Sequence, residues 1–224
     1  ARQLEKIKLD EMRPSSRRSP YIKFELEKVL HKQALEVEAL SKSYGDQKIF
    51  EDASFIVQAK EKVAIIGATG IGKTTLLKCL VGDLAPNDAG AKIKFSEQAK
   101  ISYYAQDHSD LFKSDQTLFE YLYAFKKPLS ALSGGEQARM LFAQFTLEKP
   151  NILLLDEPTN HVEMESIEAL NTALEQYEGT VIFVSHDREF VSSVATRIIE
   201  ILPDSIEDYH GTYDEYLQKQ AIEA

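Results

Sequence analysis

The stretch of sequence that decides the fold is Gly67-Ala68-Thr69-Gly70-Ile71-Gly72-Lys73-Thr74. Spaced glycines followed by Lys and Thr form the P-loop pattern, in which the backbone curls so that its N–H groups point at phosphate oxygens. An apolar run over residues 62–66 precedes it, and a helical stretch over residues 76–80 follows, whose N-terminus adds positive potential. The sequence therefore predicts a nucleotide phosphate site here, an ordinary tight turn between strand and helix being the alternative.

Within this motif the chemistry assigns separate roles to two side chains. Lys73 would neutralise charge on the β- and γ-phosphates, and the Thr74 hydroxyl would bind Mg²⁺. The residues that we expect to contact the nucleotide are Gly67, Ala68, Thr69, Gly70, Ile71, Gly72, Lys73, Thr74 and Thr75.

A second motif, Ile152-Leu153-Leu154-Leu155-Asp156-Glu157, is an apolar strand that ends in two acids. In open α/β sheets, ligands bind at the carboxyl ends of the strands. Asp156 would reach Mg²⁺, through water, and Glu157 would polarise the attacking water as a general base. Many strands end in Asp, so this motif gains its meaning from the P-loop upstream.

A third motif, Leu132-Ser133-Gly134-Gly135-Glu136-Gln137, opens a helix. Ser133 is a good N-cap, and Glu136 falls at the third helical position, so a plain capping box is the alternative interpretation. The paired glycines permit close backbone approach, which favours a ligand-binding turn once the other two motifs are considered.

Strands and helices alternate along most of the chain, which predicts an α/β fold with a mainly parallel sheet covered on both faces. The expected strands are 62–66, 101–105, 152–155 and 181–184, and the expected helices are 118–125, one after Gly135, 167–177 and one from Asp187. Two earlier strands, at 35–40 and 49–57, follow each other without a helix and predict an antiparallel subsheet. Spacing near the N-terminus favours a helix over 4–12, followed by a linker over 14–20.

Composition narrows the class of protein. The 224 residues suffice for one large α/β domain or two small ones, and the single Cys79 excludes a disulfide framework and most zinc sites. No apolar run is long enough to cross a membrane and no secretory signal is visible, so we expect a cytoplasmic protein. Because the chain lacks an initial Met, we expect it to be a fragment.

Charge is distributed unevenly along the chain. The formal net charge is −10, which alone argues against nucleic-acid binding, yet residues 1–32 contain nine Lys/Arg and only five Asp/Glu. Two interpretations of residues 1–32 stay open: a basic arm that extends from an acidic domain, or a helix and loop whose polar side chains face solvent.

The order of these motifs, with a lone His after the last buried strand, resembles that of ATP-binding-cassette (ABC) ATPases, over residues 34–224. This resemblance implies ATP hydrolysis and three further roles. Tyr44 would stack on adenine, Gln106 would lie near Mg²⁺ and the lytic water, and His186 would contact the γ-phosphate. Glu157, His186 and Gln106 are then the catalytic residues, while Thr74, Gln106 and Asp156 hold the metal.

A narrower resemblance, to the ABC-F family, comes from Glu157-Pro158-Thr159-Asn160-His161 and from residues 210–216. Residues 103–108 and 184–191 are similar to its YbiT-like subgroup. The chain would then be a C-terminal cassette over 33–224, with an α-helical subdomain at about 107–149. Residues 1–32 would end an interdomain linker whose basic residues approach rRNA and tRNA on the ribosome.

The same resemblance implies that ATP lies between two cassettes. Ser133, Gly134, Gly135 and Glu136 would cover ATP that is bound by the N-terminal cassette of the full-length protein. A head-to-tail homodimer of this chain is the other way to complete such a site. The main rival function is the ATPase subunit of a membrane transporter. A second rival is a chromosome-structure ATPase head, although the heptads of its coiled coil are absent.

Two places depart from the family pattern. The D-loop of the family usually reads Asn-His-Leu-Asp but is Asn160-His161-Val162-Glu163 here. The extra methylene of Glu163 is therefore expected to misplace a carboxylate that communicates between the two ATP sites. Thr69 stands at a P-loop position where Asn is common, which is a milder change. The interval from Gln106 to Ser133 is 27 residues, which is short for the helical subdomain. We therefore expect a segment to be missing from the sequence between Lys127 and Pro128.

Overall fold

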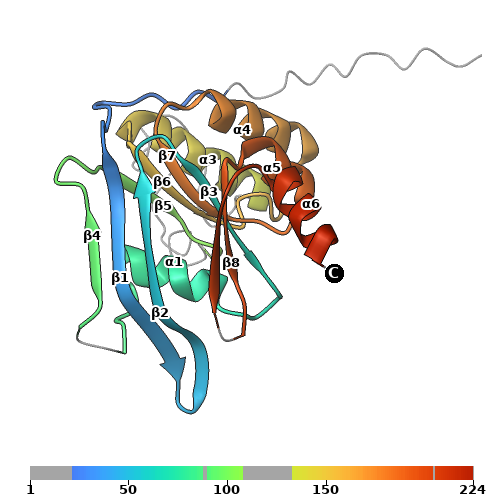
Figure 1. Ribbon diagram of the computed structural model, residues 1–224. Coiled ribbons are helices and arrows are strands. Elements are labelled where there is room, and N and C mark those ends of the chain that lie inside the picture. The colour runs from blue at the N-terminus through green and yellow to red at the C-terminus, as the bar shows by residue number, and fades with distance from the viewer. Residues whose placement is uncertain (1–21, 88–89, 108–132, 204, 224) are drawn as a thin grey trace, which may run out of the picture.

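A six-stranded sheet forms the centre of the protein in the computed structural model, which describes residues 22–87, 90–107, 133–203 and 205–223 (Figure 1). Its order is β5-β6-β7-β3-β8-β9. The strands are β5 (Ile101–Tyr104), β6 (Ile152–Asp156), β7 (Thr180–Val184), β3 (Lys62–Gly67), β8 (Arg197–Ile201) and β9 (Ile206–His210). All neighbours are parallel except β9, which runs antiparallel to β8, so the predicted mainly parallel sheet is confirmed.

A separate antiparallel sheet has the order β2-β1-β4, with β1 (Gln33–Tyr44) in the middle, β2 (Gln47–Gln58) on one side and β4 (Lys92–Phe95) on the other. The predicted antiparallel subsheet is confirmed. Its third strand, β4, was not expected from sequence, because four residues of alternating Lys and apolar side chains give too short a signal for a strand.

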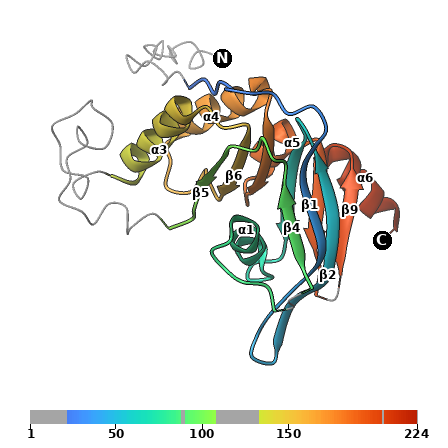
Figure 2. The ribbon, with the colours of Figure 1, turned by 90° about the vertical axis from the view of Figure 1, so that its left-hand side faces the viewer.

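Helices cover both faces of the central sheet, as Figure 2 shows. Helix α1 (Lys73–Val81) lies on one face, and α3 (Gly134–Glu148), α4 (Met164–Gln176) and α5 (Arg188–Val194) lie on the other, while α6 (Tyr213–Glu223) ends the described chain. The helices expected over 4–12 and 118–125, and the expected break between Lys127 and Pro128, lie outside the described residues. In the described ranges no helix has the length and apolar character needed to cross a bilayer.

Side chains on the central strands point alternately into two hydrophobic cores, one on each face of the sheet. Leu153 and Phe183 point into the core under α3, α4 and α5, whereas their neighbours Leu154 and Ile182 point into the core shared with α1 and the antiparallel sheet. Strands buried on both faces must be apolar at nearly every position, which accounts for the continuous hydrophobic runs in the sequence.

Residues 22–32, here termed the anchored segment, pack against the rest of the domain. Phe24 is buried, with ring centroids 6.5 Å from Phe145 and 6.0 Å from Tyr177. The Glu27 amide donates to the Lys149 carbonyl at the end of α3, over 3.2 Å. The anchored segment therefore joins the C-terminal end of α3 to the start of β1.

Candidate functional site

Three neighbouring parallel strands end at one edge of the central sheet and bring the phosphate loop, the Asp156–Glu157 pair and His186 to it. Strand β3 leads into residues 67–72, β6 ends at Asp156, and β7 leads to Ser185 and His186. The carboxyl edge of a parallel sheet is where ligands bind in open α/β folds. The topology therefore brings together groups that lie more than a hundred residues apart.

The loop over residues 67–72 depends on glycine for its shape. Gly67 and Gly72 have φ of 139° and 117°, in the region that side chains rarely adopt. A Cβ added at Gly67 would lie 2.5 Å from the Ile201 carbonyl oxygen, and one at Gly72 would lie 2.0 Å from Ile49 Cγ2. Both positions thus exclude any larger residue, for reasons of conformation and of space.

Helix α1 begins directly behind this loop with an open N-terminus. No side chain caps it, and its first turn has no acidic residue. Lys73 Nζ donates to the carbonyls of Gly67 and Ala68, both at 2.9 Å, and burial lowers the pKa of this ammonium, opposed by Glu157 and Asp156. Unpaired helix N–H groups next to an ammonium form a site for anions such as phosphates.

Asp156 and Thr74 meet where a metal would be needed. The Thr74 hydroxyl donates to Asp156 Oδ1 over 3.1 Å, and Asp156 Oδ2 is buried without a hydrogen-bond partner among the described residues. Burial raises the pKa of Asp156 to about 6. The described part of the chain holds no cluster of three His, Cys, Asp or Glu that could bind a metal by itself. A hydroxyl and one carboxylate fit Mg²⁺, which takes its other ligands from water and phosphate.

Glu157 lies next to His186. The His186 amide donates to Glu157 Oε2 over 3.2 Å, and His186 Nε2 lies 3.2 Å from Glu157 Oε1, a buried oxygen that accepts no hydrogen bond within the described residues. Glu157 also has a φ of 52°, which is rare for a residue with a side chain. Such strain occurs at functional sites, where it fixes the direction of a side chain.

A pocket of about 390 Å³, here termed the P-loop pocket, opens beside the phosphate loop; Thr74, Asp156 and Glu157 do not line it. It is lined by Gly67, Ala68, Lys73, Ser185 and His186, together with residues of α6. The α6 side chains are Tyr213, Tyr216, Leu217 and Gln220. Sequence reasoning missed them as neighbours of the P-loop. Their helical spacing was the only signal, and it shows a buried face without showing what that face contacts.

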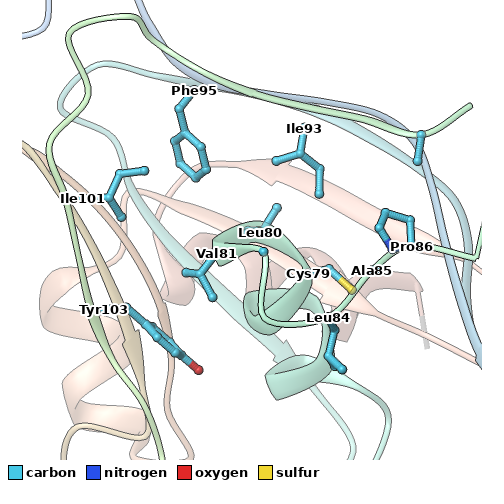
Figure 3. Close-up of a pocket in the computed structure, with 12 residues that line it drawn as sticks. Cys79, Leu80, Val81, Leu84, Ala85, Pro86, Ile93, Phe95, Ile101 and Tyr103 are labelled. Atoms are coloured by element: carbon cyan, nitrogen blue, oxygen red, sulfur yellow. The ribbon is translucent and has the colours of Figure 1, made fainter. Parts of the chain in front are cut away.

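A larger pocket, of about 640 Å³, lies between the end of α1 and strands β4 and β5 (Figure 3). Side chains such as Leu80, Ile93, Phe95 and Tyr103 line it, and no charged residue does. A phosphate group finds no cation there, so the smaller pocket is the candidate nucleotide site.

No residue of the turn over 133–136 lines the P-loop pocket of its own chain. Ser133 forms the capping box with Glu136, whose amide bonds Ser133 Oγ while its carboxylate accepts from the Ser133 amide. Gly134 lies against His161 instead, 3.3 Å from its Cβ when a Cβ is added. The capping box and the close backbone approach thus coexist.

Two other predicted residues, Tyr44 and Gln106, do not line the P-loop pocket. Tyr44 is half-exposed at the end of β1, with Lys42 Nζ 5.7 Å from its ring centroid. Gln106 is exposed just beyond β5, beside the strand that ends at Asp156. Both are accessible to a ligand.

Comparison with known proteins identifies the family. A family model described as ABC transporter matches residues 50–121 and 114–160. The Escherichia coli O157:H7 protein named "Probable ATP-binding protein YbiT" is 49% identical over 247 residues, covering 100% of this chain and 46% of that protein. "ABC transporter F family member 5" of Arabidopsis thaliana is 32% identical, covering 97% of this chain and 35% of that protein. The chain belongs to the ABC-F family.

This ABC-F cassette shares its fold with solved ABC ATPases. It superposes on "RNase-L Inhibitor" with a TM-score of 0.69 and 22% identity, covering 86% of this chain and 43% of that one. A bacterial Atm1-family ABC exporter with ATP bound gives a TM-score of 0.67 at 18% identity, covering 88% of this chain and 44% of that one. The predicted P-loop ATPase fold of the ABC-cassette type is confirmed.

The chain spans less than half the length of the curated ABC-F relatives named above. Its alignment to YbiT extends over 247 residues although the chain has 224, so this chain lacks residues that the alignment contains. A missing segment between Lys127 and Pro128 stays a prediction.

Proposed function

We propose that this chain binds Mg²⁺-ATP at the P-loop pocket and hydrolyses it as the C-terminal cassette of an ABC-F translation factor. The observation that carries the proposal is the Thr74–Asp156 contact in front of an uncapped helix N-terminus and Lys73. Thr74 and Asp156 would hold Mg²⁺, which neutralises charge on the β- and γ-phosphates. Lys73 would exchange its two carbonyl partners for phosphate oxygens.

Glu157 is the group best supported as general base. Its Oε1 is buried and accepts no hydrogen bond within the described residues, and its backbone conformation holds the side chain at the sheet edge. Glu157 would accept the proton of the water whose oxygen attacks the γ-phosphorus, while the bond from that phosphorus to the β–γ bridging oxygen breaks. His186 would bind the γ-phosphate and keep the Glu157 carboxylate in place, and Gln106 would orient the water and complete the metal's shell.

A second cassette is needed to complete the site. No residue of the turn over 133–136 lines the P-loop pocket of its own chain, which is compatible with its use by ATP on a partner. In the native protein that partner would be the N-terminal cassette. For the isolated chain it would be a second copy placed head to tail.

The ribosome is the proposed target of the intact protein. Support comes from membership of the ABC-F family and from the excess of Lys and Arg in residues 1–32, which suits rRNA and tRNA phosphates. This role places the protein in the cytoplasm and gives it no membrane partner.

Calorimetry of Mg²⁺-ATP binding tests the site. Lys73→Ala is expected to weaken binding more than tenfold, because a buried ammonium is lost from the phosphates. Lys94→Ala, which removes an exposed cation from β4, should leave the affinity unchanged. Equal affinity of the Lys73→Ala variant and the parent chain would refute the assignment.

Sedimentation with ribosomes tests the biological role. The intact protein with Glu157→Gln, together with the matching change in its other cassette, should remain on ribosomes in ATP and leave them in ADP. Sedimentation with membranes instead would favour the transporter interpretation.

A further inference from the structure

Glu163 occupies the N-cap position of α4 but does not cap the helix. Its backbone is extended, with φ −68° and ψ 149°, and its side chain makes no capping hydrogen bond. Asp at an N-cap commonly folds back onto the first amides of its own helix, whereas the additional methylene of Glu makes that geometry poor. The Glu163 carboxylate is therefore free to find another partner.

That partner lies on the helix that begins at the Ser133 turn. Glu163 Oε2 is 3.5 Å from Arg139 Nη1, and the same nitrogen donates to the hydroxyl of buried Ser166 over 3.4 Å. Arg139 thus connects α3 with the first turn of α4. Side-chain exposures of 35% for Arg139 and 59% for Glu163 mean that water screens the pair only in part.

A second contact joins the start of α3 to the loop over residues 157–163 and involves their backbones. A Cβ on Gly134 would lie 3.3 Å from His161 Cβ, and one on Gly135 would lie 3.9 Å from the His161 carbonyl oxygen. His161 itself has a φ of 61°, in the left-handed region that residues with a side chain seldom adopt. Two separate contacts therefore join α3 to residues 157–163: the Arg139–Glu163 ion pair and the close approach of Gly134 to His161.

We propose that Glu163 is a positioning residue that ties residues 157–163 to α3 through Arg139. The D-loop and the Ser133 turn then move as one unit, which matters because both would face the partner cassette under the proposed function, on which this inference rests. The longer side chain gives the carboxylate a defined partner on α3. A shorter Asp would give up this tie and cap α4 instead.

Amide hydrogen exchange of the chain reports the tie directly. The Gln137 amide bonds the Ser133 carbonyl in α3, and the Asn160 amide bonds the Glu157 carbonyl in the D-loop. Glu163→Gln and Arg139→Gln should each raise exchange at both amides by about twofold to fivefold, as expected for a partly exposed ion pair. The double variant should exchange no faster than Arg139→Gln, because losing the guanidinium already removes the ion pair with Glu163 as well as the Ser166 hydrogen bond.

Glu163→Asp separates this role from a general effect on stability. It keeps the charge and can cap α4, so the unfolding midpoint should hold or rise while exchange at Gln137 still increases. Glu168→Gln removes an exposed carboxylate from the same helix and serves as the control that leaves exchange unchanged. Unaltered exchange at Gln137 in Glu163→Asp, or multiplied effects in the double variant, would overturn the proposal.

Two further measurements distinguish the role of the Glu163–Arg139 contact from the proposed function in ATP binding. Glu163→Asp should not change the affinity of the chain for Mg²⁺-ATP, since Glu163 lies outside the P-loop pocket. In the intact protein it should lower ATP turnover about twofold to fivefold with KM unchanged. Failure of the parent chain to bind ATP would refute the function without affecting the exchange result.

Discussion

Replacing the buried Asp156 by Asn is expected to make the protein more stable at neutral pH. Its pKa is about 6 in the folded chain, against 3.8 for a free side chain, chiefly because burial disfavours the charged form. Between these two values the folded state binds more protons than the unfolded state, so the free energy of unfolding falls as pH rises through this window. Above pH 6 the folded protein carries the full destabilisation caused by the buried, ionised Asp156.

The size of this effect follows from the two pKa values. Each pH unit between them corresponds to about 1.4 kcal/mol, so the ionised carboxylate costs about 3 kcal/mol at pH 7.5 and about 1 kcal/mol at pH 4.5. Asn has nearly the same shape, can still accept from the Thr74 hydroxyl, and carries no charge. Asp156→Asn should therefore gain about 3 kcal/mol at pH 7.5 and about 1 kcal/mol at pH 4.5.

Urea unfolding at these two pH values, without nucleotide or Mg²⁺, measures the difference. Asp46→Asn, which removes an exposed carboxylate in the turn between β1 and β2, is the matched control and should change stability little at either pH. A variant that is less stable than the parent at pH 7.5, or a gain that does not vary with pH, would refute the reasoning.

Three other outcomes are expected. Gly72→Ala should lose about 2–4 kcal/mol in urea unfolding, because the new Cβ would clash with Ile49 in addition to straining the backbone; Gly82→Ala, at φ 86° with open space around it, should lose only the strain part, and equal losses would contradict the clash. Phe24→Ala should lose about 3 kcal/mol of stability with ATP affinity unchanged, since the buried ring packs on Phe145 and Tyr177 and does not line the P-loop pocket, and a loss under about 1 kcal/mol would show that the anchored segment does not pack. ATP turnover per molecule of the isolated chain should rise with its concentration, whereas constant turnover equal to that of the intact protein would contradict a shared site.

The central sheet and the phosphate loop could be predicted from sequence because their signals are local. Residues 62–66 and 152–155 are continuous apolar runs, and the glycine spacing at 67–72 has few other uses. Strand β4 escaped notice, because its four residues form a strand only through pairing with β1. Propensity over so short a stretch says little when tertiary pairing decides the outcome.

Contacts between motifs could not be read from the sequence. The position of Glu163 as an unusual D-loop residue was visible, but its partner Arg139 depends on how α3 packs beside α4. The α6 residues that line the P-loop pocket are a similar case, because Tyr213 and Tyr216 are far in sequence from the P-loop. Spacing along a helix shows which face is buried and leaves its neighbour undetermined.

The two hydrogen bonds from Lys73 to the carbonyls of Gly67 and Ala68 also bear on the speed of nucleotide capture. These two intramolecular hydrogen bonds hold the loop in its curled conformation before any ligand binds. A loop shaped in advance loses little conformational entropy when a phosphate arrives, because the ammonium only changes partners. Association should then be governed by diffusion and charge, and differences in affinity among P-loop variants should appear mainly in how fast the nucleotide leaves.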